Sequence, residues 1–237
     1  MDEPVLQLYP PPAQERPLPG LYLAHDLRQH AAATGRPYIY ADFVASLDGR
    51  IAVPHPTRPG LSVPKDVAND RDWRLFQELA AQADLIISTG RYLRDWAEGR
   101  AQELLELDDP RYADLRAWRE AQGLRPQPDI AIVSRSLDFP LPDILTEGGR
   151  KVVFFTTGRH DQRRLRAIEA RAGQVRIVGE DRAEGRHLAH ALADLGYGLV
   201  YSAAGPQILH MLLSGRVLDR LYLTYANRIL GGERYAT

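Results

Sequence analysis

The stretch Leu199-Val-Tyr-Ser-Ala-Ala-Gly-Pro-Gln-Ile-Leu-His-Met-Leu-Leu213 joins a short apolar strand to a helix through a turn of small residues. Pro206 suits the first helical position, because the amide that it lacks would have no partner there. The amides of such a turn point at whatever lies above the helix, which is often a phosphate. A second segment, Tyr40-Ala-Asp-Phe-Val-Ala-Ser-Leu-Asp-Gly-Arg-Ile-Ala52, indicates a strand that breaks at Asp48-Gly49 and then resumes. Together the two segments predict a sheet with a nucleotide across the ends of its strands.

The composition is that of an ordinary globular protein, with 44% hydrophobic and 26% charged residues among 237. A net charge of −1 gives no electrostatic case for a nucleic-acid partner. No run approaches the roughly 20 apolar residues that cross a bilayer, and the N-terminus lacks the regions of a signal peptide. We therefore expect a cytoplasmic protein without a membrane partner. The absence of cysteine excludes disulfides, thiolate metal sites and cysteine nucleophiles.

Strand and helix patterns alternate along the chain. We expect a proline-rich extended arm over residues 1–20, which could also reach a second subunit, and a helix over 24–33. Together they form a separate N-terminal segment at 1–37, which precedes one domain at 38–237. This alternation predicts an α/β fold whose mostly parallel, mixed sheet carries helices on both faces. Strands are expected at 38–46, 85–89, 129–134, 151–156, 175–178, 199–202 and 221–225, and helices at 66–83, 109–123, 161–172, 185–195 and after 205.

Two local expectations can be tested directly. The helix that ends near Ala83 should be capped by Asp66 or Asn69 and should turn a set of apolar residues toward the core, namely Trp73, Phe76, Leu79, Ala80 and Ala83. Residues 53–65, which contain four prolines, should form a loop.

The candidate binding residues lie where strands end. Carboxyl ends of parallel strands bind ligands in such sheets, which makes positional candidates of Ser46, Thr89, Ser134, Thr156 and Ser202. Neither the dinucleotide fingerprint nor the P-loop pattern is present. Phosphate binding therefore depends on two turns, 88–91 and 203–207, and either turn could be an ordinary connection between strand and helix. His187 and His190 lie three residues apart, but no third ligand is near, so we expect a solvated helix face and no metal.

An ordered set of motifs resembles the reductase domain of bacterial riboflavin biosynthesis over about residues 38–232. The resemblance implies a dihydrofolate-reductase-like fold, usually dimeric, that uses NADPH to reduce the ribosyl group of a phosphoribosylaminopyrimidine to a ribityl chain. The bifunctional members also carry a zinc deaminase domain, for which this chain has neither the length nor the cysteines. The motifs are Phe43–Ala52, Gly60–Ser62, Ala83–Arg94, Ile130–Asp138, Ala204–Leu209, Leu218–Leu223 and Asn227–Gly232.

The resemblance also suggests which residues form the site. The nicotinamide would lie by Ala45, and no catalytic acid or base is assigned. The rest of the cofactor would be bound by Thr89, Gly90, Arg91, Tyr92, Ala204, Gly205, Pro206, Gln207, Ile208 and Leu209. The substrate side is assigned to Ser46, Asp48, Ser62, Asp95 and Ala203, although Asp48 is equally compatible with a purely structural turn.

Three departures from the family pattern leave alternatives open. Ala203 stands where the family usually has an acidic residue, Tyr92 where it has threonine, and Asp95 is all that remains of an Asp-Asp-Pro motif. Losing one hydrogen-bond partner weakens substrate binding by about 1–3 kcal/mol. The alternatives are a diverged NADP-binding protein without this activity, or a reductase of another heterocyclic or carbonyl substrate. Only five residues follow Gly231-Gly232, where the family adds a final strand, so we expect that this strand is missing from the sequence or is supplied differently.

Two further predictions concern the cofactor and the assembly. We expect NADPH to be preferred over NADH, because Arg91, Arg135 and Arg159 follow strand ends and no acidic residue stands about 20 residues beyond either turn. We expect a homodimer, because the segment Leu221-Tyr-Leu-Thr-Tyr225 would place large residues on both faces of a sheet edge. The remaining partner would be a small pyrimidine ribotide substrate.

Overall fold

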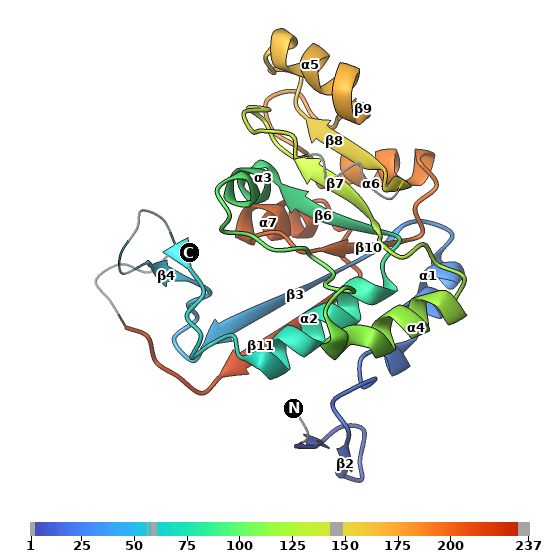
Figure 1. The fold of residues 1–237 in the computed structure, drawn as a ribbon, viewed down its shortest axis with the longest axis vertical. Coiled ribbons are helices and arrows are strands. Elements are labelled where there is room, and N and C mark those ends of the chain that lie inside the picture. Colours follow the sequence, from blue (N-terminus) through green and yellow to red (C-terminus); the bar gives the residue numbers. More distant parts are fainter. Residues whose placement is uncertain (1–2, 56, 58–60, 143–148, 232–237) are drawn as a thin grey trace. The chain divides into compact units, whose positions relative to one another are not determined.

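A computed structural model describes residues 3–55, 57, 61–142 and 149–231. A seven-stranded sheet with the order β11-β3-β10-β6-β7-β8-β9 is its main feature (Figure 1). The five pairings from β3 to β9 are all parallel, which confirms the predicted α/β class. Gly60 and the chain after Gly231 lie outside the described residues. The strands are β3 (Tyr38–Ser46), β6 (Leu85–Thr89), β7 (Asp129–Val133), β8 (Val152–Thr156), β9 (Gln174–Ile177), β10 (Leu199–Ser202) and β11 (Arg220–Ala226).

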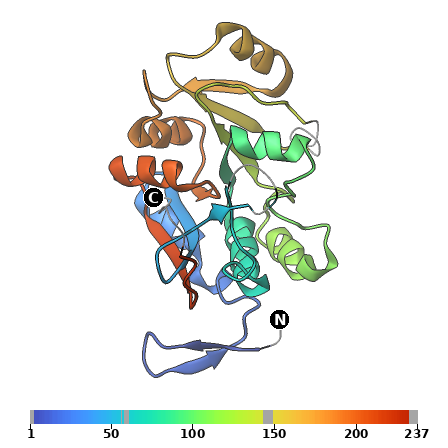
Figure 2. The same ribbon diagram turned by 90° about the vertical axis from the view of Figure 1, so that its left-hand side faces the viewer.

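Apart from α3, for which the sequence predicts no bounds, the helices begin and end within a few residues of where the sequence predicts them. Figure 2 shows α6 and α7 on one side of the sheet and α3 and α4 on the other. The helical segments are η1 (Leu23–His25), α1 (Leu27–Thr34), α2 (Asp70–Gln82), α3 (Gly90–Ala97), η2 (Pro110–Tyr112), α4 (Ala113–Ala121), α5 (Gln162–Ala172), α6 (Gly185–Asp194) and α7 (Pro206–Ser214).

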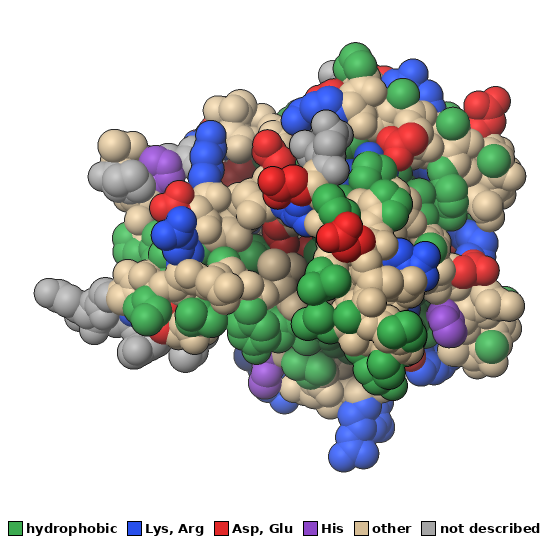
Figure 3. Space-filling model, turned by 90° about the horizontal axis from the view of Figure 1, so that it is seen from below, with side chains coloured by type: hydrophobic (Ala, Val, Ile, Leu, Met, Phe, Trp, Pro, Cys, Tyr) green, Lys and Arg blue, Asp and Glu red, His purple; other side chains and the backbone are tan. Residues whose placement is uncertain are grey.

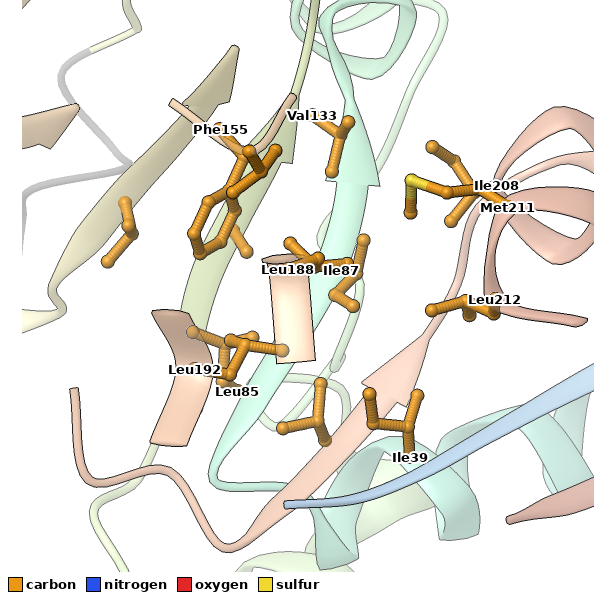
Figure 4. Packing of buried hydrophobic residues seen from close by; sticks show 14 residues of the cluster. Ile39, Leu85, Ile87, Val133, Phe155, Leu188, Leu192, Ile208, Met211 and Leu212 are labelled. Carbon is orange, nitrogen blue, oxygen red and sulfur yellow. The ribbon is translucent and has the colours of Figure 1, made fainter. Parts of the chain in front are cut away.

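The main hydrophobic cluster lies between the sheet and the pair α6 and α7 (Figure 4). The two helices approach so closely that a Cβ atom on Gly185 would lie 2.5 Å from the carbonyl oxygen of Met211. The small residue therefore sets the position of α7, whose first turn faces the carboxyl edge of the sheet. Side chains of the cluster include Ile39, Leu85, Ile87, Val133, Phe155, Leu188, Leu192, Ile208, Met211 and Leu212.

The contacts divide the chain into two compact units. The larger unit comprises Leu27–Ala41 and Ala80–Arg220, and the smaller one comprises Met1–Asp26, Asp42–Leu79 and Leu221–Thr237. In the smaller unit the proline-rich arm is extended, as expected, and it forms a hairpin of β1 (Val5–Gln7) and β2 (Gln14–Arg16). The expectation of a loop over 53–65 is wrong in part, because β4 (Val53–Pro54) pairs with β5 (Leu61–Ser62).

Helix α2 buries only part of the predicted face: Leu79 and Ala80, and Ala83 just beyond the helix, are fully buried as expected. Asn69 caps it, accepting hydrogen bonds from the amides of Arg71 and Asp72, but Trp73 and Phe76 are only half-buried. Arg74 and Glu78 are buried instead, as an ion pair of 2.7 Å. Glu78 also accepts the amides of Gly20 (2.6 Å), Tyr22 and Leu23. The end of the N-terminal arm therefore covers a polar face that periodicity alone assigns to solvent.

Candidate functional site

The carboxyl edge of the sheet in the larger unit has a topological switch point between β10 and β6. These strands are neighbours, with Ser202 opposite Ile87. After β6 the chain passes through α3 toward β7, on one side, whereas after β10 it passes through α7 toward β11, on the other. Ligands of open α/β sheets bind where the connections diverge in this way. The two turns that the sequence singles out therefore meet at this point (Figure 1).

The first turn of α7 offers unpaired backbone donors. Its N-cap residue, Gly205, is extended (φ −72°, ψ −174°), no side chain caps the helix, and Pro206 follows. Among the described residues, the amides of Ala204, Gly205 and Gln207 have no acceptor. A Cβ atom added to Gly205 would meet nothing within 4 Å. An open helix start with free amides and a positive dipole end fits an anion such as a pyrophosphate.

The other predicted residues of this turn are used differently. The amides of Ile208 and Leu209 donate to the carbonyl of Gly205, at 3.1 and 3.3 Å, and the side chain of Ile208 belongs to the core. The amide of Ala203 donates to the carbonyl of Ile87. Of the predicted segment, residues 204, 205 and 207 therefore carry the free amides.

The start of α3 is also uncapped, but it is crowded. Its N-cap residue, Thr89, is extended and makes no side-chain cap. A Cβ atom on Gly90 would lie 2.7 Å from Cδ1 of Phe139 and 3.1 Å from Oγ of Ser134. Glycine at 90 thus lets the segment after β7 pack against the start of α3, which brings Ser134 and its neighbour Arg135 beside this helix end.

Two polar side chains of α3 are already engaged within the larger unit. The hydroxyl of Tyr92 donates to the carbonyl of Gln102 at 3.2 Å, and burial, followed by the nearby Glu103, raises its pKa. The carboxylate of Asp95 accepts hydrogen bonds from Arg100 (2.6 Å) and Arg91 (3.3 Å). The assignments of Tyr92 to the cofactor and Asp95 to the substrate stay predictions, and both groups would have to exchange partners to fulfil them.

In the smaller unit, Ser46 and Asp48 form a closed turn at the end of β3. The hydroxyl of Ser46 donates to Asp48 at 2.6 Å and accepts the amide of Arg50. Asp48 also accepts the amides of Leu230 (3.1 Å) and Gly231 (2.9 Å). The hydrogen bond from Ser46, and then the one from Leu230, lower the pKa of Asp48 to about 2. The structure thus gives Asp48 a role in holding the late chain.

The other two predicted residues of this unit lie in strands. Ala45 is buried in β3, and Ser62 stands opposite Val53 in the pair of β4 and β5. Their assignments to the nicotinamide and to the substrate stay predictions.

The carboxyl edge also carries two polar residues that the sequence singled out, Thr156 and Arg135, and one that it did not, Thr157. The hydroxyls of Thr156 and Thr157, at the end of β8, are buried without a hydrogen-bond partner among the described residues. Arg135 is exposed and has no partner in the part of the chain that the structure describes. Arg91 is paired with Asp95, and Arg159 with Asp181 at 2.5 Å. In the sequence, Thr156 could be found as a candidate from its position at the end of a strand. No sequence feature pointed to Thr157.

The opposite, amino edge has a pocket of about 420 Å³ that includes Asp84, Arg119, Arg125, Asp129 and Tyr197. Its buried carboxylate, Asp129, accepts hydrogen bonds from Tyr197, Arg125 and the amide of Lys151. The charged groups of this pocket hold one another, which favours a structural role.

Metal ligation and membrane insertion find no support in the described residues. No three His, Cys, Asp or Glu side chains of that part cluster as metal ligands do. His187 and His190 face Glu184 and Asp194 at 3.7 Å. No helix within the same ranges combines the length and apolar character that crossing a membrane requires.

Residues 37–237 match the family model described as the RibD C-terminal domain. The chain belongs to this family. It is 24% identical over 203 residues, or 84% of each chain, to the 2,5-diamino-6-ribosylamino-4(3H)-pyrimidinone 5′-phosphate reductase of Archaeoglobus fulgidus. This relative is named for the class of reaction that the sequence motifs predicted.

Solved structures share the fold. A pyrimidine reductase-like protein of Corynebacterium diphtheriae has a TM-score of 0.61 and 20% identity, covering 82% of this chain and 76% of that one. RibD of Acinetobacter baumannii has a TM-score of 0.56 and 21% identity, covering 89% of this chain and 52% of that one. The riboflavin biosynthesis reductase Rib7 of Saccharomyces cerevisiae has a TM-score of 0.54 and 14% identity, with 90% and 87% covered. The dihydrofolate-reductase-like architecture is thereby confirmed.

Proposed function

We propose that this member of the RibD C-terminal domain family is an NADPH-dependent reductase of a phosphoribosylaminopyrimidine. The observation that carries the proposal is the pair of uncapped helix starts, α3 and α7, at the switch point between β6 and β10. Two positive helix ends side by side suit the pyrophosphate of a dinucleotide. When bound, the nicotinamide would supply the hydride that converts the ribosyl group to a ribityl chain. The protein contributes mainly binding and orientation.

We propose that the free amides of Ala204, Gly205 and Gln207 hold the pyrophosphate and that Arg135 contacts the 2′-phosphate. Arg135 follows Ser134, which lies against the start of α3, so the guanidinium belongs to the same edge. Its competitors Arg91 and Arg159 already pair with carboxylates. Ser134 accepts the amide of Leu137, which leaves its own proton available for donation to a ligand. A guanidinium suits a phosphate because it offers several donors in one plane.

The proposed substrate class is supported by the archaeal relative and by the sequence motifs. Two observations favour a second candidate function. Ala203 offers no acceptor at the end of β10, and Asp95 is bound by two arginines. A diverged NADP-binding protein, or a reductase of another heterocyclic or carbonyl compound, would tolerate both features.

We propose a homodimer as the working form. Strand β11 lies at the edge of the sheet, and its Leu221, Leu223 and Tyr225 are 41, 45 and 62% exposed. Large apolar side chains on an edge strand favour cover by a partner.

The deciding experiment combines binding and turnover. Purified protein is titrated with NADPH and NADH by calorimetry, then incubated with NADPH and the phosphoribosylaminopyrimidine while absorbance at the nicotinamide band is followed. Tight NADPH binding with substrate-dependent oxidation supports the proposal. Binding without oxidation identifies the diverged cofactor-binding protein, and no binding of either nucleotide refutes the site.

A further inference from the structure

Exposed apolar side chains are concentrated in the smaller unit. Nine of the eleven large hydrophobic residues that are exposed among the described residues belong to it, although it is the smaller of the two. Figure 3 shows hydrophobic side chains gathered across the middle of the face seen from below. A concentration of exposed apolar side chains marks an interaction site more often than single scattered ones do. The nine are Leu6, Leu8, Tyr9, Leu47, Val63, Leu221, Leu223, Tyr225 and Ile229.

The N-terminal hairpin provides the first half of this surface. It has only three paired positions, from Val5 opposite Arg16 to Gln7 opposite Gln14, and a two-stranded ribbon of that size is marginal in water. Arg71 holds its base by donating to the carbonyls of Glu3 and Pro4, at 3.0 and 3.2 Å.

Beyond this anchored base the hairpin presents apolar side chains that are mostly exposed within the described part of the chain. Leu6, Leu8 and Tyr9 are 58, 70 and 84% exposed. These residues precede the part of the chain that matches the family model.

Strand β11 provides the second half, because only one of its faces is covered. On the covered face, the ring of Tyr222 stacks on His25 with 5.6 Å between ring centres, and their polar atoms lie 2.9 Å apart. The alternate residues, Leu221, Leu223 and Tyr225, form the opposite face and are exposed. The strand therefore presents three large, exposed apolar side chains in a row.

We propose that the hairpin of one copy docks through Leu6, Leu8 and Tyr9 on the exposed face of β11 in a second copy, and that the second hairpin does the same in return. This rests on the homodimer of the proposed function and names the surface that forms it. Each copy carries both halves of the contact, and two-fold symmetry makes it twice in a closed pair.

Charge and area both favour a second copy as the occupant. Glu15, opposite Leu6 in the hairpin, and Arg228, just beyond β11, are exposed and of opposite sign. Neither has an ion-pair partner among the described residues. The six apolar residues are on average 60% exposed. At roughly 150–250 Å² for a whole large side chain, they offer on the order of 600 Å² per copy. That approaches the roughly 800 Å² per partner of a standard interface.

The absence of cysteine allows a direct test. Differently tagged chains carrying Leu8→Cys and Tyr225→Cys are co-expressed, purified together through both tags and oxidised. Because each chain has one thiol, every disulfide joins two chains. We expect an efficient link between positions 8 and 225, and none when Ile177→Cys, at a site 57% exposed in the larger unit, replaces Tyr225→Cys. Recovery of only 8–8 or 225–225 links, or of unlinked chains, overturns the proposal.

A second measurement separates this inference from the catalytic one. The triple variant Leu6→Ser, Leu8→Ser, Tyr9→Ser should raise the dimer dissociation constant at least tenfold in sedimentation equilibrium, with NADPH affinity unchanged. The matched control, Ile177→Ser with Leu213→Ser, removes apolar groups of similar exposure from the larger unit and should leave the dimer intact. An unchanged dimer in the triple variant refutes the hairpin contact whatever the enzyme does.

Discussion

The two edges of the sheet in the larger unit differ in whether their polar groups have partners within the protein. At the amino edge, buried charges are held by the protein itself: Asp129 by three donors, and Arg119 by the carbonyls of Ala81, Ala83 and Arg125. At the carboxyl edge, helix starts are uncapped, and the hydroxyls of Thr156 and Thr157 are buried without partners among the described residues.

This difference indicates that the amino edge contributes to the stability of the fold and that the carboxyl edge contributes to ligand binding. Unpaired buried polar groups cost free energy, and they persist where a ligand satisfies them. Substitutions at the amino edge should therefore lower the free energy of unfolding and spare ligand affinity. Substitutions at the carboxyl edge should do the reverse.

The largest effect is expected from Arg119→Met at the amino edge. The guanidinium of Arg119 is buried and joins the end of α2 to the end of α4 through three carbonyls. Burial lowers its pKa to about 10, so it is still charged at neutral pH. Loss of one member of such a buried network costs about 3–5 kcal/mol. Urea unfolding should show this loss, while Arg163→Met, an exposed arginine of α5, should change little. An equally stable Arg119→Met protein would contradict a structural amino edge.

At the carboxyl edge, Gly205→Asp should reduce NADPH affinity about 100-fold, or roughly 2.7 kcal/mol. The backbone of Gly205 is already extended, and an added Cβ meets no atom within 4 Å. Aspartate is a favoured N-cap, so its carboxylate would take the amides proposed for the pyrophosphate and repel the ligand. The melting temperature should be unchanged or higher. The control Gly205→Ala should keep both stability and most of the affinity; wild-type affinity in Gly205→Asp would remove the cofactor site.

Gly90→Ala, in the neighbouring turn, should mainly lower stability, whereas Gly205→Asp should mainly lower NADPH affinity. Its Cβ would stand 2.7 Å from Phe139, so the segment after β7 must shift. Overpacking of this kind costs about 1–3 kcal/mol. Thermal unfolding should reveal the loss, and NADPH affinity measured well below the transition should fall less than in Gly205→Asp. A variant as stable as the wild type would show that Phe139 moves freely.

The sequence predicted most of the fold because the strand and helix periods are clean. The strands 38–46 and 85–89 match β3 and β6 residue for residue. On α2 it missed the burial of Arg74 and Glu78, which depends on backbone amides 55 to 58 residues earlier in the chain. The predicted turns of the site were found, but which amides stay free depends on helix geometry. The partners of Asp48, 182 and 183 residues away, leave no local signal.

Arg135→Gln should lower NADPH affinity about tenfold, or roughly 1.4 kcal/mol, and leave NADH affinity unchanged. The change removes the unpaired cation of the carboxyl edge without altering side-chain length greatly. Arg159→Gln, which breaks an exposed pair with Asp181, serves as the matched control and should affect neither nucleotide. Calorimetry with both nucleotides decides the matter. If the Arg159 variant rather than the Arg135 variant lost selectivity, the 2′-phosphate would belong one strand further along the edge.

The smallest effect is expected from Asp48, which extends the comparison to the smaller unit. This strand-end carboxylate accepts hydrogen bonds from Ser46, Leu230 and Gly231. Like the charged groups of the amino edge, it therefore has its partners within the protein. Its pKa is about 2 in the folded protein, below the ordinary 3.8. Its contribution to stability is therefore complete above pH 3.8 and is lost as the pH falls toward 2. Asp48→Asn should lower the free energy of unfolding by the same small amount throughout pH 6–8, and should flatten the acid limb of the stability curve, as followed by urea unfolding at each pH. A carboxyl titrating near pH 4 in the folded protein, measured by NMR, would show that the turn does not hold the late chain.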